Sequence, residues 1–241
     1  MAKERSEALT AAQMRAIEAE AMATGKVSGL ALMERAGRGV LEAVFAHWPL
    51  FAEGHHRAVI LCGPGNNGGD GFVVARLLRG LGWQVEAFLW GPVSKLPPDA
   101  RTNFDRLDNV RYLPDEIETF EDAASHAPDL RADPAKVGLR PFLLVDALFG
   151  IGLKRPLPDM AGLQWHWDYL TNFDDLNDAR VVAIDVPSGL DADTGNVVGG
   201  ADVLTILAAH LTVTFHRLKR GHIRGDGSRF CGEVVVKDIG L

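Results

Sequence analysis

The sequence predicts a doubly wound α/β domain, in which helices cover both faces of a mostly parallel sheet. Short, continuously apolar segments recur along the chain, and the one at 58–62 is followed by glycine, as is typical of buried parallel strands. Between them lie segments with apolar residues every three or four positions, which is the pattern of helices. The 241 residues, 47% of them hydrophobic, suffice for one domain over 1–241 with a core of its own.

The first two elements are expected to be helices. Thr10 is a capping residue, so a helix is predicted from there to about Thr24, before Gly25. A second helix is predicted from about Ser28 to His47, and we expect the helices of 10–47 to pack on the sheet core. Strands are then expected at 58–62, 84–90, 142–146, 181–185, 211–215 and 233–237, with a helix at 71–81. Residues 108–140 carry no readable pattern.

Composition excludes several classes of function. There are 25 Lys and Arg against 32 Asp and Glu, a net charge of −7, which argues against a nucleic-acid-binding domain. No segment approaches the 18 or more apolar residues that a membrane span needs, and the N-terminus is polar, so a cytoplasmic protein is expected. Cys62 and Cys231 lack the spacing of metal ligands and are expected to be reduced core thiols.

Function in open parallel sheets lies at the carboxyl ends of the strands. The first such end carries the segment Gly63–Gly71, GPGNNGGDG, whose glycines allow backbone N–H groups to approach an anionic ligand at a helix start. Its first six residues also fit the G-x-G-x-x-G pattern of dinucleotide-dependent dehydrogenases. That pattern requires an acidic residue about 20 positions later, at a strand end. Glu86 has this spacing but lies near the start of its strand, so the dehydrogenase reading is weak.

Two further strands end in a carboxylate. Asp146 is followed by a glycine-spaced turn that leads to Lys154 and Arg155, which suit phosphate or carboxamide groups, although Asp146 alone could equally cap that turn. Asp185 closes the next buried strand, where burial could raise the pKa of its carboxyl into the acid–base range. Ser188 lacks the G-x-S-x-G context of a nucleophile, so we interpret its hydroxyl as a ligand.

These motifs resemble the YjeF N-terminal domain, the NAD(P)HX epimerase family. The resemblance rests on GPGNNGGDG, VDALFGIGLKRPL, VPSGLDADTG and VTFHRLKRGH, with LALMERAGRGV near the start and CGEVVVKDIG at the end. It extends along essentially the whole chain, and Arg35 is a departure where relatives often have Asn. It implies a Rossmann-like three-layer α/β/α sandwich and a repair reaction that interconverts the R and S epimers of NADH or NADPH hydrated at C6 of the nicotinamide ring.

The resemblance also implies site residues, carried over position by position. Substrate binding is implied for Asn66, Asn67, Gly68, Gly69, Asp70, Gly150, Ile151, Gly152, Leu153, Lys154, Arg155, Pro156 and Asp185. One potassium ion per subunit is implied, with Asn67, Asp146 and Ser188 as ligands; these are hard oxygen donors, whereas zinc would favour Cys or His. Lys219 and Arg220 fit a basic late loop of the family, but a solvated turn fits equally, and we leave them outside the site. His55, His56 and His216 are expected to be surface residues.

The chemistry assigned to the family fits these groups. The hydrate is a carbinolamine, whose hydroxyl-bearing carbon can lose its configuration through loss of water to an iminium or through ring opening. Either route needs a carboxyl group that transfers a proton, and we predict that Asp185 is this acid–base residue. Asp70 is the competitor, but it opens the predicted helix, where the helix dipole is expected to hold it ionised.

Two other classes of function stay open at this point. One is a catalytically inactive nucleotide-binding or scaffold module of the same fold, which would not equilibrate the epimers. The other is a nucleotide-dependent oxidoreductase, which would oxidise NADH with a carbonyl substrate. The resemblance further implies a tendency to homodimers, and bifunctional relatives continue into a dehydratase domain. We expect no dehydratase activity from this chain alone, because it lacks the phosphate-binding half of that domain.

Overall fold

A computed structural model describes the chain at residues 8–112, 142–157, 179–200 and 206–241. In this part of the chain, one seven-stranded sheet has the order β3-β2-β1-β4-β5-β6-β7, and all neighbouring strands are parallel. The strands are β1 (Arg57–Cys62), β2 (Gln84–Leu89), β3 (Val110–Tyr112), β4 (Phe142–Ala147), β5 (Ala179–Ile184), β6 (Leu211–Phe215) and β7 (Glu233–Lys237). The predicted parallel α/β fold is confirmed.

The predicted helices are present, with one difference at a boundary. The described α-helices are α2 (Ala11–Ala23), α3 (Gly29–His47), α4 (Asn66–Gly80), α5 (Pro98–Asp105) and α8 (Gly227–Phe230). Four short 3-10 turns accompany them: η1 (Pro49–Ala52), η2 (Val93–Lys95), η4 (Val198–Gly200) and η6 (Arg220–Ile223). The helix predicted at 71–81 begins five residues earlier, at Asn66. Helix α5 and strand β3 were not predicted, and residues 113–141 of the unreadable segment lie outside the described part.

The two faces of the sheet bury separate apolar clusters. Alternate residues of the central strands, such as Ile60 and Val145, pack against α3, α4 and α5. The opposite face buries Leu61 and Leu144 against 207–209. A second layer of helices was predicted on this opposite face. Residues 158–178, between β4 and β5, and residues 201–205, between β5 and β6, lie outside the described residues.

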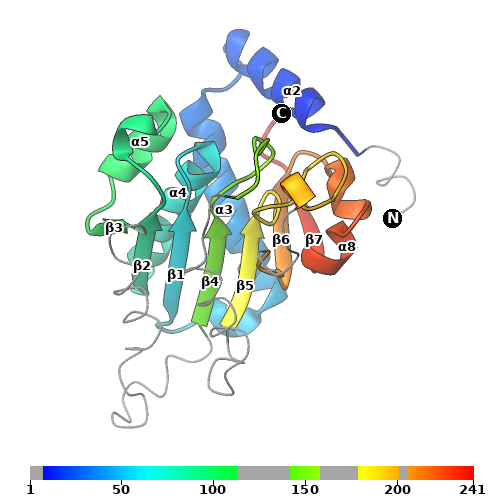
Figure 1. The fold of residues 1–241 in the computed structure, drawn as a ribbon. Helices are drawn as coiled ribbons and strands as arrows, with labels where there is room; N and C mark the ends of the chain where they lie inside the picture. The colour runs from blue at the N-terminus through cyan, green and yellow to red at the C-terminus, as the bar shows by residue number, and fades with distance from the viewer. Residues whose placement is uncertain (1–7, 113–141, 158–178, 201–205) are drawn as a thin grey trace.

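Helix α2 does not lie on a face of the sheet with α3 but across the carboxyl ends of the strands, above their arrowheads in Figure 1. The chain before it pairs with the segment after β6: Leu9 N donates to Leu218 O at 2.8 Å, and Arg220 N donates to Leu9 O at 3.0 Å. Thr10 then caps α2, as predicted, by accepting a hydrogen bond from Gln13 N. The N-terminal helix is thereby fixed over the edge of the sheet where function is expected.

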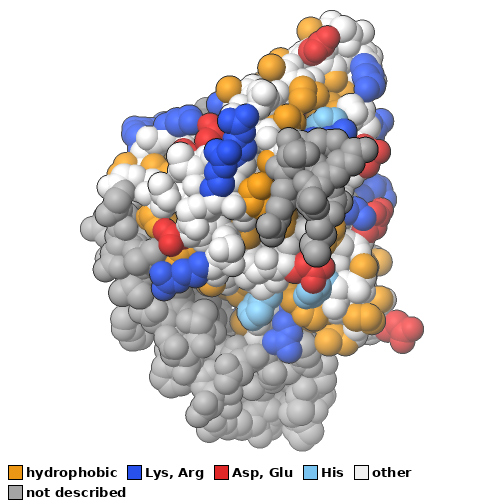
Figure 2. Space-filling view, turned by 90° about the vertical axis from the view of Figure 1, so that its right-hand side faces the viewer, with side chains coloured by type: hydrophobic (Ala, Val, Ile, Leu, Met, Phe, Trp, Pro, Cys, Tyr) orange, Lys and Arg blue, Asp and Glu red, His pale blue; other side chains and the backbone are white. Residues whose placement is uncertain are grey.

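On the face shown in Figure 2, charged and hydrophobic side chains are interspersed. Within the described residues, no helix is both long enough and apolar enough to cross a membrane. Cys62 and Cys231 are free and buried, as predicted. The surface prediction for His56 is wrong, because its ring is buried against the aromatic rings of Phe51 and Trp83.

Candidate active site

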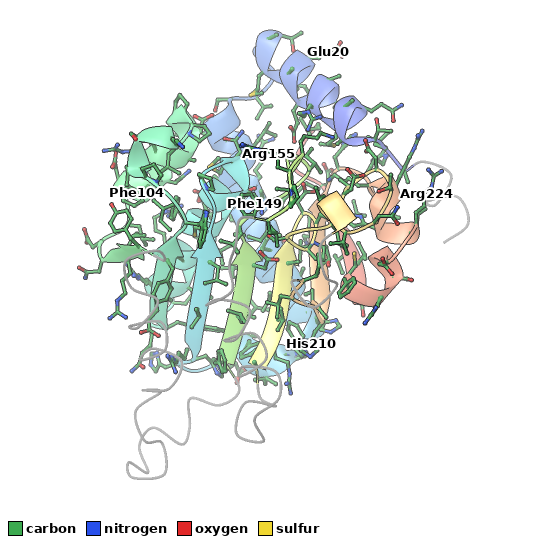
Figure 3. The ribbon with its side chains drawn as sticks, in the orientation of Figure 1. Glu20, Phe104, Phe149, Arg155, His210 and Arg224 are labelled. Carbon is green, nitrogen blue, oxygen red and sulfur yellow. The ribbon has the colours of Figure 1, made fainter. Side chains whose placement is uncertain are left out.

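A cavity of about 530 Å³ opens at the carboxyl ends of the strands, beneath α2. It brings together segments that are far apart in the sequence: α2, the start of α4, the turn after β4, Asp185 after β5, and the segment after β6. Figure 3 shows two of its residues, Phe149 and Arg155, between the sheet and α2, whereas His210 lies at the opposite end of the strands. Its lining is Met14, Arg15, Glu18, Pro64, Gly65, Asn66, Asn67, Asp70, Leu148, Phe149, Gly150, Ile151, Gly152, Leu153, Lys154, Arg155, Asp185, Phe215 and Lys219.

The glycine-rich segment contributes through its polar residues rather than through all its glycines. Asn66, Asn67 and Asp70 line the cavity from the first turns of α4. Gly68 and Gly69 do not line it, because both are buried in packing contacts. A Cβ on Gly68 would collide with the carbonyl of Gly63, and one on Gly69 would meet the Met33 side chain. These two glycines are required for close packing.

The turn after β4 forms the opposite wall. All its predicted binding residues from Gly150 to Arg155 line the cavity, whereas Pro156 packs beside Gly199. Arg15 Nη1 on α2 donates to Ile151 O at 3.1 Å, so α2 and the turn are joined over the cavity. Arg15, Lys154 and Arg155 make this rim cationic, which suits a ligand that carries phosphate groups.

The predicted cation ligands Asp146 and Ser188 lie together below the cavity. Asp146 is 1% exposed; its Oδ1 accepts from Ser188 Oγ at 2.6 Å and its Oδ2 from Ser188 N at 2.8 Å. Ser188 Oγ also lies 3.2 Å from Phe149 O, which adds a carbonyl to the set. Burial raises the pKa of Asp146, and within the described residues no Lys or Arg pairs with it.

Asn67 is the third predicted cation ligand, and its amide is incompletely satisfied. Its Nδ2 is buried and has no hydrogen-bond partner in the part of the chain that the structure describes. Its Oδ1 and Asp185 Oδ2 each lie 3.1 Å from the position that a Cβ on Gly150 would occupy. A buried carboxylate, a hydroxyl, a carbonyl and an amide oxygen are the donors that a hard cation prefers, so these residues fit a potassium ion. Among the described residues, no cluster of three or more His, Cys, Asp or Glu side chains could hold a metal ion.

Asp185 directly follows β5 and is held in an unusual conformation. Its φ is 68°, in the left-handed region that non-glycine residues rarely adopt, at a cost of about 1–3 kcal/mol. Its Oδ1 accepts from Lys219 Nζ at 2.7 Å and from Thr214 Oγ1 at 3.0 Å. Burial alone would raise the pKa of Asp185, but Lys219, His222 and these hydrogen bonds outweigh it, so the pKa lies below its usual value. The predicted direction of this shift is wrong because Lys219 was not included in the site.

Sequence analysis missed several residues of the site: Arg15 and Glu18 on α2, and Lys219 and His222 after β6. Lys219, set aside as equally consistent with a solvated turn, is 1% exposed and lines the cavity, whereas Arg220 does not line it. His222 is 3% exposed, and its Nε2 lies 2.8 Å from Asp185 O. One signal was available: Lys219 closely follows the strand predicted at 211–215, and the carboxyl ends of parallel strands lie at the same edge of the sheet, where Asp185 was also expected.

Two more carboxyl groups line the cavity with Asp185. Asp70 is the fifth residue of α4, and burial, together with the charges of Asp185 and Glu18, raises its pKa well above the usual value. The helix dipole was expected to keep the pKa of Asp70 low, but desolvation and the neighbouring carboxylate charges shift it in the opposite direction. Burial and the charge of Asp185 also raise the pKa of Glu18, on α2. The site therefore contains one carboxyl group whose pKa is lowered and two whose pKa values are raised.

The chain matches a known protein family. A family model described as YjeF-related protein N-terminus matches residues 29–221, which is more than half of the chain. The chain belongs to the YjeF-related protein N-terminus family.

Relatives in the YjeF-related family cover the chain almost completely. A Roseobacter litoralis protein named NAD(P)H-hydrate epimerase is 46% identical over 97% of this chain and 98% of its own length. A Rhodobacter capsulatus protein with the same name is 43% identical over 98% of this chain and 100% of its own. A Moorella thermoacetica protein named bifunctional NAD(P)H-hydrate repair enzyme Nnr is 34% identical, and this chain covers 40% of it.

The fold also has a counterpart among solved structures. The crystal structure of yeast ynu0, YNL200c, aligns with a TM-score of 0.68 over 96% of this chain and 88% of the yeast chain. The sequences are 22% identical, so this likeness concerns the fold alone.

Proposed function

We propose that this protein is an NAD(P)H-hydrate epimerase, which interconverts the R and S epimers of hydrated NADH and NADPH. The observation that carries the proposal is the 46% identity, over 97% of the chain, to a relative that bears this name. The geometry supports it, because segments expected to bind the substrate meet at one cavity, which carboxyl groups from α2, α4 and the end of β5 also line.

The cavity suits the two halves of such a substrate. Its volume of about 530 Å³ lies within the range of small-molecule sites, and its opening has three cationic residues, Arg15, Lys154 and Arg155. These cations suit the pyrophosphate of a dinucleotide. The hydrated ring would then lie toward Asp70 and Asp185 at the other side of the cavity.

Loss of configuration at the hydroxyl-bearing carbon requires movement of protons and stabilisation of a developing positive charge. On the water-loss route, Asp185, whose pKa is lowered, can stabilise the iminium by its charge. On the ring-opening route it can accept the hydroxyl proton while the C–N bond breaks, and return that proton to the leaving ring nitrogen. The pKa of Asp70 is raised well above its usual value, which favours it as the acid that gives a proton to the departing hydroxyl on the water-loss route and takes it back when water returns. In other enzymes, two carboxyl groups whose pKa values are shifted in opposite directions act as the base and the acid.

Potassium would complete the site on this proposal. Asn67, Asp146 and Ser188 would hold the ion, with Asp146 supplying the only carboxylate of that set. Bound there, the ion would compensate the buried charge of Asp146 and fix the turn after β4, because Ser188 Oγ accepts from Phe149 N at 2.9 Å. On this proposal, the exchange rate depends on potassium.

The test is epimer exchange followed by chiral chromatography, beginning from one pure epimer of NADHX. The wild-type protein should equilibrate the two epimers without net oxidation. Asp185→Asn keeps shape and hydrogen bonding, so it should lower the exchange rate by about 10²–10⁴-fold while the hydrate still binds.

Asp70→Asn is the matched comparison, since it changes another carboxyl group of the same cavity. We expect it to lower the exchange rate as well, but less than Asp185→Asn. If Asp70→Asn abolishes exchange and Asp185→Asn leaves it near the wild-type rate, Asp185 is not the acid–base residue. Binding of the hydrate without exchange by the wild type would indicate a binding module instead.

A further inference from the structure

Lys219 is among the largest fully buried side chains in the described part of the molecule. Its ammonium group contacts Asp185 Oδ1 at 2.7 Å, Thr214 Oγ1 at 2.7 Å and Phe215 O at 3.1 Å. All three partners belong to the ends of β5 and β6, and Lys219 also lines the cavity. A buried lysine with every contact directed at the site is not explained by solubility or by surface charge.

The two carboxylate oxygens of Asp185 have different contacts. Oδ1 accepts from both Lys219 Nζ and Thr214 Oγ1, and Lys219 Nζ also donates to Thr214 Oγ1, so the three groups form a closed set. Among the described residues, the hydrogen-bond contact of Oδ2 is the long one from Ile151 N, at 3.4 Å, in the turn that lines the cavity. One oxygen is therefore fixed, and the other remains for a ligand.

The backbone of Asp185 is fixed from the same segment. Lys219 N donates to His222 Nδ1 at 3.1 Å, so Nε2 carries the ring proton and donates to Asp185 O at 2.8 Å. Burial and the nearby Lys219 charge lower the pKa of His222 to about 4, which keeps the ring neutral in this role. Together with the hydrogen bond from Asp185 N to Val213 O, these contacts hold a residue whose φ is 68°.

Stability alone does not account for the pair. Removing two charges from water costs free energy that a buried ion pair regains only in part, and apolar residues of similar size are often more stabilising. Lys219 also acts electrostatically on Glu18 and Asp70, which line the same cavity. Its ammonium group nevertheless contacts Asp185. Such an arrangement is expected where the orientation of one carboxylate matters for function.

We propose that Lys219 is a positioning residue for the reaction: with Thr214, it holds Asp185 by Oδ1 and thereby presents Oδ2 to the substrate. This inference rests on the proposed epimerase function and extends it to a residue that acts through Asp185. Lys219 supplies orientation and charge, and Asp185 Oδ2 contacts the reacting group.

The kinetic test is a double-mutant cycle of Lys219→Met and Asp185→Asn, with Lys219→Arg as the conservative variant. In the wild-type background, Lys219→Met should lower kcat by about 100-fold with little change in KM, because the carboxylate loses its orientation. In the Asp185→Asn background, the same change should cost less than about threefold, because Lys219 acts through Asp185. Lys219→Arg keeps the charge and should recover part of the loss. Lys95→Met, at an exposed lysine outside the cavity lining, is the control.

The double variant removes both charges and leaves no unpaired buried ion, so it is expected to fold even if a single variant does not. Circular dichroism and thermal unfolding verify that each variant is folded. Independent, multiplicative effects of the two substitutions, or an effect of Lys219→Met on KM alone, would overturn the inference.

A second measurement separates this inference from the proposed function. The carboxyl carbon of Asp185 can be followed by NMR during acid titration of the wild type and Lys219→Met. Without Lys219, the midpoint should move to higher pH, because burial is then less compensated. The same midpoint in both proteins would contradict the arrangement. If the wild type does not exchange epimers, the proposed function fails, yet the titration still reports on Lys219.

Discussion

His222 should make the protein less stable as the pH falls from 7 toward 4. Its pKa is about 4 in the folded protein, because the ring is buried beside Lys219, against an ordinary value of 6.5. Between these values the unfolded chain binds a proton that the folded protein does not, so acid favours unfolding. The stabilisation is therefore complete above about pH 6.5 and is lost progressively down to about pH 4.

The magnitude follows from the two pKa values. At about 1.4 kcal/mol for each pKa unit, the full loss of unfolding free energy is roughly 3 kcal/mol. About 2 kcal/mol of it falls between pH 7 and pH 4.5. This exceeds the uncertainty of a denaturation experiment on a small protein.

The assay is urea unfolding of the wild type and His222→Gln at several pH values between 7 and 4.5. His222→Gln cannot titrate in this range, so its unfolding free energy should fall by about 2 kcal/mol less than that of the wild type. Groups shared by both proteins cancel in this comparison, including His210 and His216, whose pKa values burial also lowers, and Asp70, whose pKa burial raises. Equal pH dependence of the two proteins would refute the reasoning.

Two further predictions concern the site. Replacing potassium by tetramethylammonium in the buffer should lower both the exchange rate and the unfolding midpoint, and restoring potassium should reverse both; unchanged values would contradict the proposed ion site. Gly150→Ala should slow exchange by about tenfold or more with little change in unfolding temperature, because its Cβ would crowd Asn67 Oδ1 and Asp185 Oδ2 at 3.1 Å. Gly80→Ala, where a Cβ meets nothing within 4 Å, is the control, and equal rates for the two variants would show that the crowding is harmless.

The parallel sheet could be predicted because its strands are buried on both faces. Segments such as Phe142–Ala147 are therefore continuously apolar, a pattern that is visible in one sequence. The start of α4 could not be placed, because Gly68 and Gly69 lower helix propensity and resemble a loop. They occur within the helix because the packing against Gly63 and Met33 leaves no room for a Cβ.

The site was predictable where a strand end carried a distinctive residue, as at Asp146 and Asp185. It was not predictable where the role depends on burial. Lys219 and Arg220 are adjacent cations in the sequence, and only the tertiary structure buries one and leaves the other outside the cavity lining. The pKa values of Asp70 and Asp185 likewise depend on distances to charges from other elements, which no local pattern contains.

The exchange of NADHX epimers by the purified 241-residue protein tests the central claim most directly. Starting from the pure R or the pure S epimer, the account predicts convergence to one mixture, at a rate proportional to protein concentration and reduced by Asp185→Asn by about 10²–10⁴-fold. Convergence no faster than in buffer alone, at any potassium concentration, would contradict it.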